Sequence, residues 1–417
     1  MIARASQLRI VVTGLITQHP LLGGMTWHYL HYVLGLRRIG HDVYYIEDSG
    51  EWPYNLDGGA SGEDFSAATC DGNVEYLAEV MRRFGLEGRW AYHSPIDDTW
   101  FGLSSQKRKT VIESADLLLN VSGTIPCPEE FRRIRTLAYI DTDPVFTQIT
   151  LARGQQDLRR VVDFHDVQFS FGECLPGMAP STGHQWYPTR QPVVLTEWRP
   201  SLPCRDAFTT IMNWASYEPE SYQGRRYGQK DVEFSRFLDL PGRVAPAVLE
   251  IAGRGMRTDP LRTAENWNEA GSVSARLAAA GWRVASAVGV CADFENYRRY
   301  IEFSKAEWSV AKNAYVAARC GWFSDRSACY LAAGRPVVVQ DTGFGAVLPV
   351  GEGILTFANM DEAVAAIQEI QADYERHRLA ARAIAEEYFD SSKVLSRLVE
   401  QAMNGGSHSV SDASDSE

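Results

Sequence analysis

The feature that most limits how this chain can fold is a strand–helix–strand pattern at its start. LRIVVTGLI (8–16) is a β-branched run that ends at a loop containing Gly23 and Gly24. A helical pattern follows from about 26 to 38, and DVYYIED (42–48) is a second strand-like run. A unit of this size is what a right-handed crossover between parallel strands requires. We therefore predict that the chain opens with an α/β domain.

The same alternation continues through the first half of the chain. Strand-like runs occur at ADLLLNVS (115–122), RTLAYID (135–141) and VQFSFG (167–172), and the segments between them are polar or helical in period. Six prolines then fall within 174–204, which is typical of an ordered connection between domains. We predict a doubly wound first domain with its boundary near 196–206.

The alternation restarts in the second half and favours another parallel α/β domain. We expect helices around 230–238, across 273–281, across 325–333 and over much of 361–402. We expect strands at FTTIMNW (208–214), AVLEIAG (247–253), WRVASAVG (282–289), YRRYIEFS (297–304) and PVVVQD (336–341).

Composition narrows the class of protein. With 417 residues, 45% of them hydrophobic, the chain is long enough for two ordinary domains. A formal charge of −12 offers no basic face to displace counterions, so we expect no nucleic acid partner. Seven cysteines without a C-x2-C pair predict reduced thiols and no metal site. The first strand has neither a cleavage site nor a long apolar span, so we expect a cytoplasmic protein without a membrane span.

Three stretches together resemble one known family. SDRSACYLAAGRPVVVQDTGFG (324–345) is similar to a helix that ends in a small-residue-Gly-x-Pro turn and leads into a buried strand and a glycine loop. SKAE (304–307) is similar to an S-x-x-E step upstream of that helix, and Gly23-Gly24 precedes Gly40-His41 with similar spacing. The order of these stretches resembles the GT-B glycosyltransferases, most nearly the large retaining group with an E-x7-E donor motif.

The chain departs from that motif at one position. The second Glu should fall five residues before Gly334, where Cys329 stands. About a dozen extra residues, KNAYVAARCGWF, also separate Glu307 from the helix that follows. The sequence therefore leaves open whether the transferred sugar keeps or inverts its configuration.

The resemblance implies two Rossmann-like doubly wound domains that face a cleft, with a C-terminal helix returning to the first domain. We expect residues 1–200 to form the acceptor-side domain and 201–390 the nucleotide-sugar domain. Residues 391–403 would be the returning helix and 404–417 a disordered polar tail. The resemblance also implies a nucleotide-sugar donor such as a UDP-sugar, a small-molecule or glycan acceptor, and no cofactor.

The donor diphosphate needs N–H donors and cations, and a helix N-terminus presents unpaired amides with a dipole of the right sign. Ser324, Asp325, Arg326 and Ser327 open a predicted helix and supply capping side chains and a cation. We expect the diphosphate or ribose over this turn. The alternative is that Ser324 or Asp325 only caps the helix and Arg326 is a surface charge.

The resemblance adds further donor-binding positions. It implies a phosphate-contacting lysine at Lys230 and a Glu at Glu307 that accepts hydrogen bonds from sugar or ribose hydroxyls. Asn213 stands where the family commonly has an arginine. For these residues the alternative is an ordinary exposed side chain, and for the glycines it is an ordinary tight turn. The remaining expected donor-binding residues are Gly23, Gly24, Ser304, Lys305 and Gly343.

Four residues are candidates for catalysis. Asp141 and Asp143 follow a predicted strand, where a carboxylate can orient an acceptor hydroxyl or take its proton. The alternative for this pair is an Asx turn leading into a proline. His28, on a helix face next to the core face, and His165, at a strand start, are candidate bases, and a packed structural role is the alternative for both.

Two other functions remain open alongside a glycosyltransferase. One is a GT-B nucleotide-sugar epimerase, which needs no acceptor. The other is a catalytically silent nucleotide- or carbohydrate-binding protein, because function depends on the site and not on the fold. The loop after the first strand, LITQHPLLGGMT, has no G-x-G-x-x-G fingerprint, and the chain has no P-loop or G-x-S-x-G elbow. We predict a glycosyltransferase.

Overall fold

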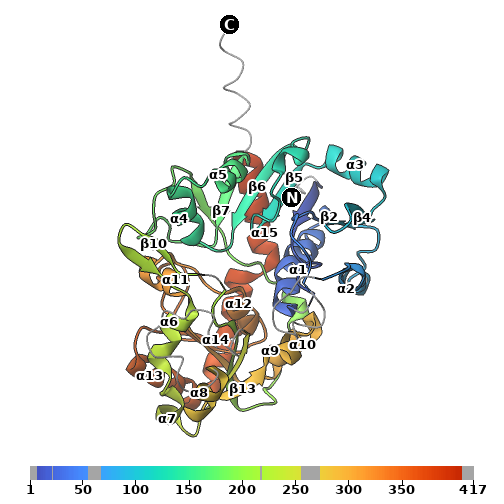
Figure 1. Ribbon diagram of the computed structural model, residues 1–417. Helices are drawn as coiled ribbons and strands as arrows, with labels where there is room; N and C mark the ends of the chain where they lie inside the picture. Colours follow the sequence, from blue (N-terminus) through green and yellow to red (C-terminus); the bar gives the residue numbers. More distant parts are fainter. Residues whose placement is uncertain (1–6, 21, 55–66, 217, 255–272, 406–417) are drawn as a thin grey trace, which may run out of the picture.

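The computed structural model describes residues 7–20, 22–54, 67–216, 218–254 and 273–405. They form two α/β domains, and the blue-to-green part of the chain lies above the yellow-to-orange part in Figure 1. Each domain contains a mostly parallel sheet covered by helices. The predicted fold of two doubly wound domains is confirmed.

The first domain is built on eight strands in the order β4-β3-β2-β1-β5-β6-β7-β8, and only the β3–β4 pair is antiparallel. The central strands are apolar runs buried along their whole length, as parallel strands covered on both faces require. The strands are β1 (Arg9–Thr13), β2 (Asp42–Glu47), β3 (Trp90–Ser94), β4 (Thr99–Gly102), β5 (Leu117–Val121), β6 (Thr136–Asp141), β7 (Val167–Ser170) and β8 (Trp186–Pro188).

The helix α1 (Gly23–Arg38) joins β1 to β2 and is buried over most of its surface. It is apolar on most sides because it packs on the first sheet and also on helices from the second half of the chain. The other helices of this domain are α2 (Asp71–Arg83), α3 (Ser105–Ser114), α4 (Phe146–Ala152) and α5 (Gln156–Asp163).

The second domain contains six parallel strands in the order β13-β12-β9-β14-β15-β16. The strand order reverses between β9 and β14, and in open α/β sheets ligands bind at the carboxyl ends of the strands at such a switch point. The strands are β9 (Ala207–Asn213), β12 (Val248–Arg254), β13 (Arg283–Ser286), β14 (Ala306–Ser309), β15 (Val337–Gln340) and β16 (Ile354–Phe357), with a separate hairpin of β10 (Glu220–Tyr222) and β11 (Arg225–Tyr227).

Helices flank this second sheet along its length. The predicted helix across 325–333 is confirmed as α12. The helices are α6 (Lys230–Phe234), α7 (Leu240–Val244), α8 (Val273–Ala279), α9 (Ala287–Cys291), α10 (Phe294–Phe303), α11 (Asn313–Ala318), α12 (Asp325–Ala332), α13 (Met360–Ala372) and α14 (Tyr374–Ile384).

One predicted strand is a helix. YRRYIEFS (297–304) belongs to α10, which Asp293 caps by accepting a backbone hydrogen bond at 2.7 Å. Tyr297 and Ile301 lie one helical turn apart and are both buried, so packing on one helix face overrides the β preference of the aromatic residues. The strand expected here follows instead as β14.

The last helix, α15 (Ser391–Gly405), packs on α1 and β6 of the first domain and is the red helix beside β6 in Figure 1. The two connections between the domains run side by side. The Val193 N–H donates to the Phe389 carbonyl at 2.7 Å, and the Ser391 N–H donates to the Val193 carbonyl at 2.9 Å. The predicted polar tail lies, from residue 406 onward, outside the described residues.

Gly35 allows α15 to approach α1. A Cβ there would lie 2.5 Å from Leu395 Cδ1 and 2.8 Å from Ser391 Cβ.

We predict that Gly35→Ala destabilises the protein by roughly 1–3 kcal/mol, because overpacking outweighs the gain in helix propensity. Gly242→Ala is the matched control: this helical glycine has no atom within 4 Å of an added Cβ. It should stabilise by up to about 1 kcal/mol. Equal unfolding midpoints in urea for the two variants would contradict this role.

Candidate functional site

A pocket of about 880 Å³ opens between the two domains at the switch point of the second sheet. The end of β9 and the first turns of α6 and α12 form its second-domain side, and the start of α1 closes it from the first domain. The lining residues are Leu22, Gly24, Met25, Ile211, Met212, Asn213, Lys230, Ala287, Val288, Cys291, Tyr297, Asp325 and Arg326.

The Gly23-Gly24 pair is where α1 meets the second domain. A Cβ at Gly23 would lie 2.2 Å from the carbonyl oxygen of Asp293, and a Cβ at Gly24 would lie 3.0 Å from the Tyr297 ring. The missing side chains therefore allow α10 to approach α1. Tyr297 becomes a wall of the pocket as a result, and only Gly24 of the pair lines it.

Lys230 begins α6 and provides the lysine of the pocket. Burial, together with the positive charges of Arg326 and Lys312, lowers its pKa to about 7. The nearby carboxylates of Asp325 and Glu307 act in the opposite direction with smaller effect. A lysine with this pKa gains a proton when an anion arrives beside it.

Arg326 is held in a buried network. Its Nε donates to Glu307, its Nη1 to the Ile211 carbonyl and its Nη2 to the Ser309 hydroxyl, each at 2.6 Å. Glu307 is fully buried in β14, so the ion pair lies away from water. The interpretation of Arg326 as a surface charge is therefore wrong. Glu307 faces Arg326 and is not among the residues that line the pocket.

Ser304 and Lys305 lie at the opposite edge of the sheet, because they precede β14 and the pocket is at the carboxyl ends of the strands. The Ser304 hydroxyl is fully buried and donates to the Tyr300 carbonyl at 2.7 Å. Lys305 pairs with Asp206 at 2.7 Å. The prediction that both residues contact the donor does not fit this placement. The prediction followed from placing the strand at 297–304, whereas the strand is β14, which begins at Ala306.

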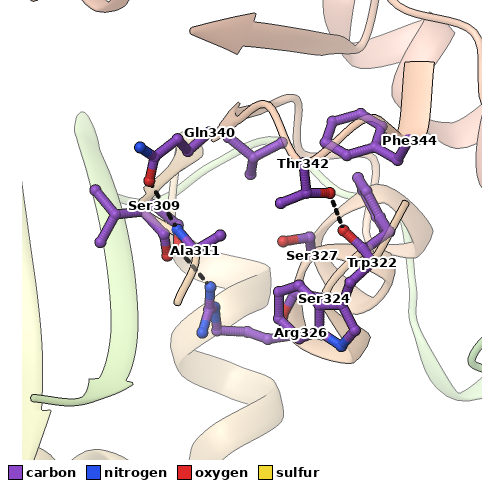
Figure 2. A pocket seen from close by; sticks show the side chains of 12 residues that line it. Ser309, Ala311, Trp322, Ser324, Arg326, Ser327, Gln340, Thr342 and Phe344 are labelled. Carbon is purple, nitrogen blue, oxygen red and sulfur yellow. Dashed lines mark hydrogen bonds between the residues drawn. The ribbon is translucent and has the colours of Figure 1, made fainter. Parts of the chain in front are cut away.

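A smaller cavity, with room for about one water molecule, shares Arg326 with the pocket and lies between the ends of β14 and β15 and the start of α12. Figure 2 shows the Ser327 hydroxyl pointing into this cavity, with Thr342 across from it. Ser324 also lines it, and its side chain makes no capping hydrogen bond. Trp322, Phe323 and Phe344 supply aromatic walls.

Gly343 lies in the turn after β15, beside this cavity. Its φ of +93° is in the left-handed region, which favours glycine. Its N–H donates to the Asp341 carboxylate at 2.7 Å, and a Cβ would lie 3.0 Å from the Arg319 carbonyl oxygen. The tight-turn interpretation therefore accounts for this glycine.

Asp141 ends β6 and holds the loop that follows it. Its buried carboxylate accepts hydrogen bonds from the Thr147 hydroxyl at 2.8 Å, the Ser170 hydroxyl at 2.9 Å and the Gln148 amide at 3.0 Å. Burial raises its pKa to about 6. Its Oδ1 also accepts the Asp143 N–H at 3.1 Å, as in the Asx turn that was the alternative, so Asp141 supports the position of Asp143.

Asp143 reaches across to the second domain. Its carboxylate forms an ion pair with Lys312, at 2.8 Å, and accepts a hydrogen bond from the Tyr315 hydroxyl. The side chain is 37% exposed, which distinguishes it from buried Asp141. The structure thus brings only one of the two predicted aspartates to the domain boundary.

His28 also meets the second domain. Its Nδ1 lies 3.8 Å from the Asp325 carboxylate, at the start of α12, and its Nε2 lies 3.5 Å from the Ser122 hydroxyl. Burial lowers the pKa of His28, and the charge of Asp325 partly opposes this effect. A neutral imidazole at this boundary has the chemistry of a general base.

His165 lies in the core of the first domain, and the prediction of a catalytic role does not fit its contacts. Its Nδ1 pairs with the Val161 carbonyl at 2.7 Å and its Nε2 with the Asn120 amide at 3.2 Å. Burial lowers its pKa to about 4. The packed structural role, which was the alternative, describes this histidine.

Besides the mostly apolar residues that line the pocket, the predictions also missed Tyr297 in its wall and Lys312 beside Asp143. Tyr297 was assigned to a strand, so its contact with the glycine pair was not predicted. Lys312 lies in the extra segment between β14 and α12, and its partner Asp143 is distant in sequence. The only available signal was the composition of that segment, KNAYVAARCGWF, in which one lysine precedes a short alanine-rich stretch.

Solved structures resemble this chain along nearly its whole length. AviGT4, a glycosyltransferase involved in avilamycin A biosynthesis, has a TM-score of 0.52 at 13% identity, over 96% of this chain and 98% of its own. Anabaena HepE in complex with UDP and glucose has a TM-score of 0.54 at 11% identity, over 95% and 99%. An α-glucosyltransferase in complex with UDP-glucose and DNA has a TM-score of 0.53 at 12% identity, over 95% and 100%.

These likenesses establish the fold. The chain has the GT-B fold, in which two Rossmann-like domains face each other across a cleft. No known family model matches the sequence, and no curated protein sequence matches it. Across the described ranges, no helix is both long enough and apolar enough to cross a bilayer.

We predict that Arg326→Met lowers the free energy of unfolding by roughly 3–5 kcal/mol, because it leaves the Glu307 carboxylate buried without a partner. The double variant Arg326→Met/Glu307→Gln removes that charge and should recover much of the loss. Urea unfolding of the wild type, both single variants and the double variant measures the coupling. Additive effects of the two substitutions would contradict the buried network.

Proposed function

We propose that this protein is a glycosyltransferase that transfers a sugar, a hexose or a related sugar, from a UDP-sugar to a small-molecule or glycan acceptor. The observation that carries the proposal is the pocket at the switch point. It combines Lys230, the first turn of α12 and an aromatic wall in one cleft between Rossmann-like domains. Amides at a helix start and a cation together suit a diphosphate.

The donor nucleotide would lie over the carboxyl end of β9. Asn213 and Lys230 face it from the second domain, and Gly24 faces it from the first. Asp325 lies in the first turn of α12, where backbone amides lack intrahelical acceptors. Stabilising the charge of the leaving diphosphate is the main electrostatic task of such a site.

We place the donor sugar at the mouth of the smaller cavity, whose interior has room for about one water molecule. Hydroxyl groups of Ser327 and Thr342 and the aromatic rings around them suit a ring that carries hydroxyls.

Ser327→Leu fills this cavity and should weaken UDP-glucose binding at least tenfold while leaving UDP binding nearly unchanged. Ser327→Ala, which removes only the hydroxyl, is the control. Calorimetric titration with both ligands checks this, and an equal loss for UDP would place the diphosphate, not the sugar, at Ser327.

The acceptor would approach from the first domain, beside Asp143 and His28. Either group could orient the acceptor hydroxyl or take its proton, since both stand at the domain boundary, His28 beside Asp325 and Asp143 beside Lys312. The formal charge of −12 disfavours a polynucleotide acceptor, although one protein with the same fold is described in complex with DNA.

The proposed reaction uses protein cations in place of a metal ion. Lys230 and the α12 amides supply positive charge where the leaving group forms. A chelator should therefore leave UDP binding and turnover unchanged. Full loss of turnover in a chelator, restored by a divalent cation, would contradict this part of the proposal.

Stereochemistry and the class of function can be decided together. Cys329 stands where the E-x7-E group has its second Glu, and its thiol lies 3.8 Å from His31 in a buried contact. The anomeric configuration of the product, read by NMR, distinguishes retention from inversion. UDP release that depends on an acceptor supports transfer. Release or sugar isomerisation without an acceptor would favour an epimerase, and binding without turnover would favour a silent binding protein.

Lys230 leads to a prediction about pH. Its pKa of about 7 in the free protein means that it is mostly neutral at pH 8, and a bound diphosphate raises that pKa. UDP binding at pH 8 should therefore take up to about one proton, and affinity should fall as pH rises from 7 to 9. Calorimetry in two buffers of different ionisation enthalpy measures the uptake. Lys230→Met should abolish it, whereas Lys305→Met should retain it. Uptake that persists in Lys230→Met would assign the proton elsewhere.

A further inference from the structure

We propose that Lys312 is a second phosphate-binding cation of the donor site, and that it exchanges the carboxylate of Asp143 for the donor diphosphate when the nucleotide binds. This inference rests on the proposed function and deepens it. It assigns a role to the segment between β14 and α12.

The charges that line the pocket leave a diphosphate undercompensated. Arg326 is neutralised by Glu307 at 2.6 Å, and Asp325 brings a negative charge to the same wall. Lys230 is then the remaining cation among the lining residues. A nucleoside diphosphate carries about two to three negative charges. The described pocket therefore needs another cation close to Lys230.

Backbone contacts place Lys312 beside Lys230. The residue after Lys312, Asn313, donates its backbone N–H to the Gln229 carbonyl at 3.3 Å and accepts the Gly228 N–H on its side chain at 3.0 Å. These two partners immediately precede Lys230. The loops that carry the two lysines are thus joined at the edge of the pocket, and the charge of Lys312 contributes to the lowered pKa of Lys230.

Lys312 is held in a position from which it can turn. Its Nζ donates to both carboxylate oxygens of Asp143, at 2.8 and 2.9 Å, and lies 5.1 and 5.5 Å from the ring centroids of Phe146 and Tyr315. The lysine side chain has a flexible four-carbon stem, so the ammonium can move to a phosphate by rotation without any movement of the domains.

The exchange leaves Asp143 in place. The Tyr315 hydroxyl also donates to this carboxylate and remains with it when Lys312 leaves. The carboxylate oxygens that faced the ammonium can then accept a hydrogen bond from an acceptor hydroxyl. Donor binding would in this way prepare Asp143 to receive an acceptor hydroxyl, which fits a donor-first order of binding.

The test compares two variants that break the same ion pair. Lys312→Met removes the phosphate partner and should weaken UDP binding about tenfold. Asp143→Asn removes the competitor of the phosphate and should strengthen UDP binding severalfold. If the ion pair only joins the domains, both variants should change UDP affinity in the same direction. Calorimetric titration of the full chain with UDP distinguishes these outcomes.

Three controls complete the experiment. Lys312→Arg keeps the charge and should retain most of the affinity, which covers the case in which Lys312→Met fails to fold. Lys393→Met breaks the ion pair between Lys393 of α15 and Glu387, which precedes that helix, and should bind UDP as the wild type does. UDP binding by the wild type with unchanged affinity in Lys312→Met overturns this inference alone. A wild type that binds no nucleoside diphosphate overturns the proposed function, and this inference with it.

Discussion

The buried ion pair between Arg326 and Glu307 is the interaction on which the geometry of the site depends. Its guanidinium joins the first turn of α12 to β14, and through the Ile211 carbonyl to β9. These are the two strands between which the order of the second sheet reverses. The guanidinium is bonded to Glu307, to the Ile211 carbonyl and to Ser309, whereas Glu307 Oε2 has no hydrogen-bond partner among the described residues. Because separating a buried pair leaves an uncompensated charge, these bonds fix the start of α12 relative to the carboxyl ends of both strands.

That arrangement also determines the charge of the pocket. Because Arg326 is paired internally, it orients the α12 amides but offers little net charge to a ligand. The positive charge that answers an anion must then come from groups that can gain a proton, such as Lys230 with its pKa of about 7. A site of this kind carries little net charge when it is empty. The desolvation cost of burying its cations is therefore limited.

Most of the central elements of both sheets could be predicted from the sequence, because fully buried parallel strands are uninterrupted apolar runs. The edge strands β4, β8 and β16 were missed, as was β3 beside β4. The central strand β14 was missed because YRRYIEFS, just before it, was assigned to a strand on the β preference of its aromatic residues. That single error moved Ser304 and Lys305 to the wrong edge of the sheet.

The site was predicted best where a residue lies at a strand end or helix start. Gly24, Asn213, Lys230, Asp325 and Arg326 all line the pocket. The partners of these residues were not predictable, since the ion pairs of Arg326 and Asp143 join segments that only the tertiary structure brings together. His165 is a residue at a strand start that does not belong to the site. Both of its ring nitrogens have partners in the core, and its position in the sequence gives no sign of these contacts.

The two domains are joined on both sides of the pocket, and this explains what the extra segment does. On one side, α1 packs against α10 through its glycine pair and against α15 through Gly35. On the other, α11 places Ala314, Tyr315 and Ala318 in one apolar cluster with Phe146 and Ile149 of α4. The residues that interrupt the family-like spacing therefore form the second contact between the domains. Because that contact is apolar at its centre and charged at its edge, it can hold the domains together while the ammonium of Lys312 remains available to change partners.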